Sequence, residues 1–188
     1  MNGASSSGKS SIGAAFQRLV DEPWLLIGVD TFLPLLGAEW LWVPMRDLRG
    51  RHGRDGISFD AQADGSVTVT TGPAGRRLFD ALRTTVAALV ADGHDLILDL
   101  VLLDETDRAN WLAAIVDAEV LWVGIECPLD VLEAREHARG DRVLGLARAQ
   151  VHAVHEQMTY DVVIDSSTVS PDEAAAAIAA RAAQFPAP

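Results

Sequence analysis

The residues of this chain that could do chemistry begin near its first residue. Residues 3–10 read Gly-Ala-Ser-Ser-Ser-Gly-Lys-Ser, a full match to the phosphate-binding pattern G-x-x-x-x-G-K-[S/T]. Small residues in such a turn let backbone N–H groups point inward around an anion, and the helix that follows adds the positive end of its dipole. Lys9 is the only lysine in a chain that otherwise uses arginine. The pattern therefore predicts a cradle for nucleotide phosphates.

Side-chain chemistry gives each part of this loop a role. Lys9 is expected to bridge the β- and γ-phosphates of ATP, and the hydroxyl of Ser10 to complete the coordination of Mg²⁺. A flexible glycine- and serine-rich terminus could match the pattern by chance, but an amphipathic helix follows at once, as the motif requires. The residues expected to hold the nucleotide are Gly3, Ala4, Ser5, Ser6, Ser7, Gly8, Lys9, Ser10, Ser11 and, from a later segment, Arg135.

Asp30 is the candidate general base. It follows the apolar run Trp24–Val29, which is typical of a buried strand. An acceptor hydroxyl must lose its proton as it meets the γ-phosphoryl group, and a carboxylate at a strand end can take that proton. The alternative is an N-cap for the next helix, and one aspartate can do both. The residues expected to be catalytic are Lys9, Asp30, Arg139 and Arg142.

A second carboxylate is expected near the metal. The string Leu96-Ile97-Leu98-Asp99 is an apolar strand that ends in aspartate, a pattern that often orders Mg²⁺ or its water shell opposite the loop serine. The predicted metal pair is therefore Ser10 and Asp99. Because such strings are common, Asp104 stays open as the metal-shell residue, and so does a structural role for Asp99.

Arginines cluster over residues 135–148, at positions Arg135, Arg139, Arg142 and Arg148. The first two share a helix face at i, i+4, and Gly140 should end that helix and leave Arg142 on a mobile segment. This region could act as a lid that closes over the nucleotide, excludes water and neutralises charge on the transferring phosphoryl group. The alternative is an exposed helix whose arginines pair with Glu133, Glu136 and Asp141.

Histidine, cysteine and aromatic side chains carry weaker signals. His152 and His155 have a spacing seen in metal sites, but no third ligand accompanies them, so we interpret them as structural or partly exposed. Cys127 is typical of a small buried residue at a strand end, the alternative being a nucleophile. Four apolar residues after Asp30 could line an acceptor pocket or pack in the core, namely Phe32, Trp40, Trp42 and Met45.

The order of apolar runs and helical stretches predicts the scaffold. Four strand candidates alternate with helices in the β-α order of a parallel sheet covered on both faces: Trp24–Val29, Leu96–Val101, Val120–Ile125 and Val162–Ile164. The predicted helices are Ser10–Val20, Gly75–Ala91, Glu105–Val116, Leu129–Ala138, Leu144–Met158 and Pro171–Ala183. The fold class is α/β, a three-layer P-loop nucleoside triphosphate hydrolase fold whose strand ends form the ligand edge.

The chain of 188 residues is predicted to be one domain, with residues 31–74 as an insertion on the acceptor side. Alternation at residues 57–59 and 67–69 suggests a small hairpin there. A first strand is apparently missing, because only Met1 and Asn2 precede the loop. Either the start is assigned too far downstream, which we favour, or the sheet has an empty slot that something else fills. An open central slot would make the chain as written weakly stable.

The composition of the chain argues against some classes of binding partner. A formal net charge of −12 argues against nucleic acid or an anionic membrane as partners, since both need a basic face. No apolar run approaches membrane-spanning length, and the first residues lack the apolar core of a signal peptide. A single cysteine excludes an internal disulfide framework and fits a reducing compartment. We expect a soluble, cytoplasmic protein with a small-molecule partner; homo-oligomer formation stays open.

Together these segments resemble the chloramphenicol phosphotransferase-like family of P-loop kinases. The matching segments are residues 2–10, 22–30, 120–124 and 135–142, with His155 and Tyr160-Asp161. The resemblance spans nearly the whole chain and implies a single kinase domain over residues 1–188, with Asp30 as base and Arg139 and Arg142 in a lid over residues 135–148. It also implies ATP-dependent phosphorylation of a hydroxyl on a small molecule, an antibiotic of the chloramphenicol type being one candidate.

Two departures limit what the resemblance implies. Family members often carry a second acidic residue after the strand aspartate, where this chain has Leu100. The stretch Thr31–Gly72 is longer and differs in composition, so the antibiotic does not transfer with the fold. The leading hypothesis is an ATP- and Mg²⁺-dependent small-molecule kinase. The alternatives are a nucleoside or shikimate-type kinase and a non-catalytic nucleotide-binding regulatory protein.

Overall fold

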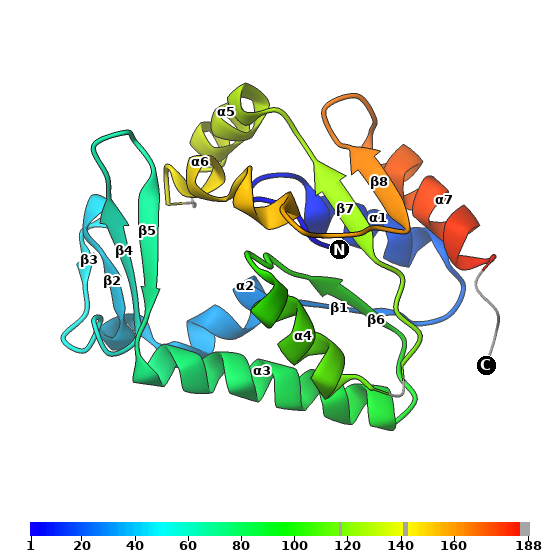
Figure 1. Cartoon of the computed structure of the whole chain (residues 1–188), viewed down its shortest axis with the longest axis horizontal. Coiled ribbons are helices and arrows are strands. Elements are labelled where there is room, and N and C mark those ends of the chain that lie inside the picture. Colours follow the sequence, from blue (N-terminus) through cyan, green and yellow to red (C-terminus); the bar gives the residue numbers. More distant parts are fainter. Residues whose placement is uncertain (117, 141–142, 185–188) are drawn as a thin grey trace.

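The strands predicted from the apolar runs form parallel pairs at the centre of the molecule. The structure, a computed structural model, describes residues 1–116, 118–140 and 143–184. β1 (Leu25–Gly28) pairs with β6 (Leu96–Asp99), and β7 (Val123–Glu126) pairs with β8 (Val162–Asp165), each pair running parallel (Figure 1). Gly28 lies opposite Asp99 in the first pair, and Glu126 opposite Asp165 in the second. The polar residues that follow the apolar runs therefore share the carboxyl edge, as predicted.

Met1 and Asn2 lie between the two strand pairs. Asn2 forms parallel bridges to Leu100 on one side and to Gly124 on the other. Its N–H donates to the Val123 carbonyl at 2.8 Å, and its carbonyl accepts from Ile125 N–H at 2.8 Å. No strand element precedes the first helix in the described residues. The central position is nevertheless not empty, because Asn2 joins the two halves of the sheet at this point.

One face of the sheet is covered by α1 (Lys9–Leu19) and α7 (Pro171–Ala182). Both carry apolar side chains at helical spacing, which bury against the strands. The buried cluster contains Ile12, Phe16, Ile97, Ile125, Ile164 and Ile178. α7 begins with a capping box: Ser170 Oγ accepts from Glu173 N–H, the Glu173 carboxylate accepts from Ser170 N–H, and Pro171 stands at the first helical position.

The other face is covered by α3 (Pro73–Ala91) and α4 (Glu105–Ala114). Their buried side chains pack with the segment after β6 in a second cluster made of Leu82, Val86, Leu100, Leu102, Trp111 and Ile115. α3 is the longest described helix and runs from the parallel sheet to the insertion (Figure 1). Among the described residues, no helix combines the length and apolar character needed to cross a lipid bilayer.

The predicted helix Leu144–Met158 is wrong, because the chain forms two shorter pieces there. α5 (Leu129–Arg139) is followed by α6 (Leu146–Gln150) and the 3₁₀ helix η4 (Ala153–His155). The Val154 carbonyl accepts from the Asn2 side-chain amide at 2.7 Å and from the Tyr160 hydroxyl at 3.2 Å. These bonds take the acceptor that a helix continuing to Met158 would use, so no α-helix passes through Val154, and α6 has already ended at Gln150.

The insertion is a small sheet of its own, larger than the predicted hairpin. Three short helical turns come before its strands, namely α2 (Val29–Phe32), η1 (Leu33–Leu36) and η2 (Ala38–Trp40). A fourth turn, η3 (Pro44–Arg46), lies between its first two strands. Its strands are β2 (Leu41–Val43), β3 (Leu48–Arg49), β4 (Ile57–Ala61) and β5 (Val67–Thr71), in the order β3-β2-β4-β5. The antiparallel pair β4–β5 confirms the predicted hairpin. Figure 1 shows this insertion sheet at one end of the molecule, apart from the parallel strands.

Candidate active site

The phosphate loop turns where two glycines are needed. Gly8 precedes α1 with φ +94°, a left-handed conformation that favours glycine. Gly3 lies so close to β7 that a Cβ atom there would be 2.6 Å from the Ile125 carbonyl oxygen. The loop is thus held against the centre of the sheet, and α1 starts at Lys9 as the motif requires.

Lys9 and Ser10 both meet Asp99 at the start of α1. The buried Lys9 ammonium donates to the carbonyls of Gly3 at 2.8 Å and Ala4 at 2.9 Å, and its Nζ lies 3.6 Å from Asp99 Oδ1. Ser10 Oγ donates to Asp99 Oδ2 at 2.5 Å. The structure therefore brings together the loop lysine and the two residues of the predicted metal pair.

The oxygen atoms of Ser10 and Asp99 suit Mg²⁺, which prefers hydroxyl, carboxylate, phosphate and water ligands. In the part of the chain that the structure describes, no group of three or more His, Cys, Asp or Glu side chains is arranged to hold a metal. Such an ion would therefore depend on the nucleotide and water for its other ligands. Asp104, the second candidate, is the N-cap of α4 and accepts from Asp107 N–H at 2.9 Å.

Two hydroxyl groups inside the loop fit an anionic ligand. Ser6 Oγ and Ser7 Oγ are buried and have no hydrogen-bond partner among the described residues. Buried hydroxyls normally have a partner, so these two donors can serve a phosphate. The Ser5 N–H instead donates to the Gln150 side chain at 2.8 Å, a contact that no sequence signal indicated.

Arg135 reaches the loop from α5. Its guanidinium donates to the Ser166 hydroxyl at 3.1 Å and to the Ser166 carbonyl at 2.7 Å. A Cβ atom on Gly8 would lie 4.0 Å from Arg135 Nη1, so the cation stands beside the loop. Cys127, buried as predicted, contacts the same guanidinium through its sulfur at 3.5 Å.

The other arginines of the predicted lid have different surroundings. Arg139 is the last residue of α5, on an exposed turn that Gly140 ends with φ +66°, as predicted. Arg142 and Asp141 lie outside the described residues. Arg148 pairs with Glu133 at 2.6 Å, which agrees with the ion-pair alternative. Glu136 does not agree with that alternative, because it is only 1% exposed and its carboxylate accepts from backbone N–H groups.

Asp30 lies in the first turn of α2, directly after β1, and its side chain is exposed. The N-cap of α2 is Gly28, so the predicted N-cap alternative for Asp30 is wrong, because the helix begins at Val29, two residues earlier than that role needs. A carboxylate in the first turn still suits the positive end of a helix. Since Gly28 pairs with Asp99, Asp30 stands at the same edge of the sheet as the loop.

Comparison with known proteins agrees with this geometry. Residues 1–183 match the sequence profile of the family described as chloramphenicol phosphotransferase-like protein. The chain belongs to this family. Two proteins of Mycobacterium tuberculosis, from strains CDC 1551 and H37Rv, are named as candidate O-phosphotransferases and are 29% identical to it over 180 residues, which cover 93% of this chain and 77% of each relative. This member of the family is a phosphotransferase of the P-loop type.

Solved structures show the same fold. An unliganded sugar kinase from Janibacter sp. HTCC2649 matches with a TM-score of 0.65 at 16% identity, covering 98% of this chain and 93% of that one. The APS kinase of Mycobacterium tuberculosis, solved with AMPPNP and APS, matches with a TM-score of 0.63 at 17% identity, covering 97% and 95%. At these identities the likeness establishes the P-loop kinase fold.

A buried network behind the loop of this chloramphenicol phosphotransferase-like protein was not predicted. Besides Val154, the Asn2 amide donates to the Tyr160 hydroxyl at 3.0 Å, and its oxygen accepts from Leu102 N–H at 2.9 Å. His155 Nδ1 lies 2.8 Å from the same hydroxyl. Burial lowers the pKa of His155 and raises the pKa of Tyr160. The two histidines therefore have separate surroundings, with His152 exposed and His155 structural.

The four predicted pocket residues are divided between different places. Trp40 stacks on His52, and Arg54 lies over the ring of Trp42 at 5.0 Å. Phe32 packs against the cluster under α3 and α4. Met45 lines a cavity of about 200 Å³ together with Arg46, His137, Gly140 and Leu144. In this family member, that cavity lies between η3 and the end of α5.

Proposed function

We propose that this chain transfers the γ-phosphoryl group of ATP to a hydroxyl group of a small molecule. The observation that carries the proposal is the meeting of Lys9, Ser10 and Asp99 at the phosphate loop, on the edge of the sheet that also presents Asp30. Positioning and charge stabilisation supply most of the catalysis in phosphoryl transfer, and this edge offers both.

The proposed step balances with the residues at this edge. A bond forms between the acceptor oxygen and the γ-phosphorus, the bond from that phosphorus to the bridging oxygen breaks, and ADP leaves. The acceptor proton passes to the carboxylate of Asp30. Lys9, which now contacts loop carbonyls, would turn its ammonium to the phosphates, and Arg135, Arg139 and Arg142 would offset the developing charge. Ser10 and Asp99 would hold Mg²⁺, which neutralises phosphate charge when bound.

The acceptor is proposed to be a small molecule with an apolar part. The cavity near the end of α5 is lined by Met45 and Leu144 as well as Arg46 and His137, so it offers both apolar and polar contacts. The family description makes an antibiotic of the chloramphenicol type the first candidate. Sugars and nucleosides are the other candidates, because the fold also occurs in a sugar kinase and an APS kinase.

The test is a panel of hydroxylated acceptors, assayed for ADP release with wild type and with Asp30→Asn. We expect one class of acceptor to stimulate ADP release, and Asp30→Asn to lower that rate about 10²- to 10⁴-fold, the usual contribution of a general base. Affinity for AMPPNP, measured by calorimetry, should stay nearly unchanged. If chloramphenicol is the acceptor, expression in a sensitive bacterium should also raise the tolerated concentration of the drug.

Asp172→Asn is the matched control for this substitution. Asp172 is also an acidic residue in the first turn of a helix, and its ion pair with Arg18 is exposed on both sides, so this variant should fold and turn over like wild type. Wild-type turnover by Asp30→Asn would remove Asp30 from the mechanism. ADP release that responds to protein partners and to no acceptor would instead favour a nucleotide-binding regulatory protein.

A further inference from the structure

Glu136 is a buried carboxylate that joins two segments of the arginine-rich region. It lies on α5 and is 1% exposed. Its Oε2 accepts from Gly145 N–H at 2.8 Å, and its Oε1 accepts from Ala147 N–H at 2.9 Å. Burying a charged group is costly unless it is hydrogen-bonded, so these two bonds must be kept for the carboxylate to stay inside. Glu136 therefore fixes α5 to the return segment, defined as residues 143–150.

The return segment packs on the insertion sheet. Val143 belongs to the same buried cluster as Val43, Ile57, Phe59 and Val67, and Leu146 packs against that cluster. Gly145 meets the β4–β5 turn so closely that a Cβ atom there would lie 2.3 Å from the Gly65 carbonyl oxygen. The insertion sheet and the return segment thus form one packed unit.

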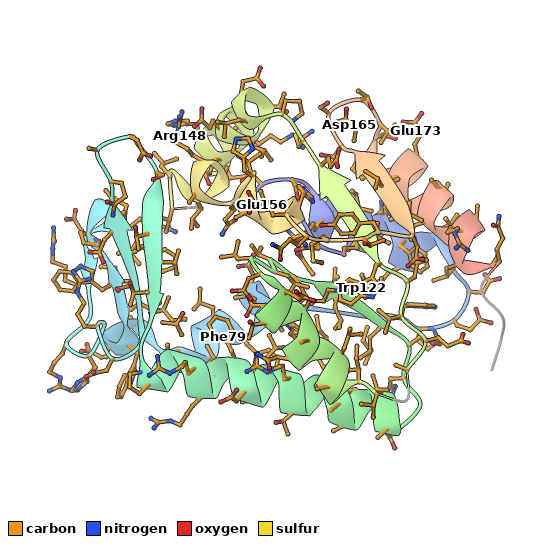
Figure 2. All side chains as sticks on the ribbon, in the orientation of Figure 1. Phe79, Trp122, Arg148, Glu156, Asp165 and Glu173 are labelled. Carbon is orange, nitrogen blue, oxygen red and sulfur yellow. The ribbon has the colours of Figure 1, made fainter. Side chains whose placement is uncertain are left out.

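Arg148 adds a second connection between the same parts. Figure 2 shows Arg148 extending from α6, where the β4–β5 hairpin approaches that helix. Its guanidinium pairs with Glu133 of α5 at 2.6 Å, and a Cβ atom on Gly65 would lie 3.8 Å from its Nε. Arg148 also helps to lower the pKa of Asp64, beside that turn, after the hydrogen bonds from Ser66.

The phosphate loop lies at the other end of this connection. Arg135 precedes Glu136 on α5; its guanidinium donates to Ser166 and lies beside Gly8. A continuous path of contacts therefore runs from the insertion sheet through the return segment and Glu136 to the cation at the phosphate loop. A buried connection of this kind transmits displacement because packed segments move as units.

We propose that Glu136 is a positioning residue that couples the insertion sheet on the acceptor side to Arg135 on the nucleotide side. This rests on the proposed function only in that nucleotide binds the loop. A ligand that engages Arg135 stabilises one placement of α5, and Glu136 passes that placement to the β4–β5 hairpin. By linkage, an acceptor bound against the insertion then strengthens nucleotide binding by the same factor.

Hydrogen exchange with AMPPNP and Mg²⁺ as the probe tests this coupling in the full chain. In wild type, nucleotide should slow exchange in the loop (residues 3–10) and also in the hairpin (residues 57–71), the latter by about fivefold or more. Glu136→Gln replaces one acceptor oxygen by a donor that faces a backbone N–H. This variant should keep the response of the loop and lose the response of the hairpin.

The readout separates coupling from a purely structural role. If Glu136 only stabilised the fold, Glu136→Gln would speed hairpin exchange equally with and without nucleotide, and the response to nucleotide would persist; that result overturns the proposal. A loop that responds in wild type while the hairpin does not would also overturn the coupling and leave the proposed function intact. If nucleotide did not slow exchange in the loop itself, both the coupling and the proposed function would be contradicted.

A pair of glycine substitutions gives a second test that does not alter the carboxylate. Gly145 and Gly140 both have positive φ, +91° and +66°, so alanine strains the backbone at both positions. A Cβ atom at Gly145 would meet the β4–β5 turn, whereas a Cβ atom at Gly140 has no heavy atom of the described residues within 4 Å. Gly145→Ala should abolish the hairpin response and Gly140→Ala should keep it. Equal behaviour of the two variants would contradict the proposed path.

Discussion

At the scale of single residues, the site depends on an ammonium group that is placed before any ligand arrives. Lys9 is buried and donates to two carbonyls of its own loop, with Asp99 nearby. These contacts keep the ammonium at the turn, within a short movement of the place where the phosphates are expected to bind. A planar guanidinium has a different shape and donor pattern, which agrees with the use of the chain's only lysine here.

Lys9→Ala should lower the phosphotransfer rate about 10²-fold or more, since the cation that would turn to the developing charge is lost. Calorimetry with AMPPNP and the ADP-release assay measure this effect. Arg18→Ala is the control, because Arg18 is an exposed cation on the same helix that pairs with Asp172. Comparable losses in the two variants would mean that Lys9 acts only through net charge.

His155 should make stability depend on pH. Burial holds its pKa below the ordinary value of about 6.5, so the folded state prefers the neutral ring that contacts Tyr160. As the pH falls, the unfolded chain therefore binds a proton at His155 before the folded state does. The stability that this residue contributes is complete above the ordinary pKa and is lost as the pH falls from there towards the lowered pKa of the folded state. Urea unfolding from about pH 7 to pH 5 should show a smaller loss for His155→Gln than for wild type. The exposed His152→Gln should keep the wild-type slope; a slope unchanged in His155→Gln would contradict the assignment.

At the scale of elements, contacts between distant segments decide where helices stop. Residues 144–158 have the spacing of one helix, yet α6 ends at Gln150, and the Val154 carbonyl further on bonds to Asn2 and Tyr160 in place of a helical N–H. Contacts between distant segments also decide part of the structure of the insertion. Its β4–β5 hairpin follows from local alternation, whereas β2 and β3 are three and two residues long and are too short to show a pattern. They pair because the return segment and α3 cover the other side of their core.

At the scale of the whole molecule, Asn2 holds the two halves of the sheet together. Its backbone bridges β7 and the end of β6, and its buried side chain bonds to Leu102, Val154 and Tyr160. The weak stability expected from an apparently missing first strand stays a prediction. It is tested by comparing the thermal melt of this chain with that of a version extended by an apolar strand.

Asn2→Ala should lower the free energy of unfolding by about 3 kcal/mol, at roughly 1 kcal/mol for each of its buried hydrogen bonds. Urea denaturation measures the change. Asn110→Ala, at an exposed position on α4, is the control and should cost little. A loss as small as that of the control would show that the backbone bridges alone join the halves.

The sequence by itself determined the parts of this protein whose signals are local. Short stretches of sequence predict the phosphate loop, the strands with their terminal polar residues and the caps of α5 and α7, since turn chemistry and hydrophobic period act between near neighbours. The order of these segments along the chain carries the family resemblance. Only the tertiary structure decided that Asp99, and not Asp104, contacts Ser10 and Lys9, that Glu136 is buried and that Asn2 fills the centre of the sheet. Those outcomes depend on which distant surfaces pack together and which buried polar atoms then need partners, and neither is visible in the order of residues along one segment.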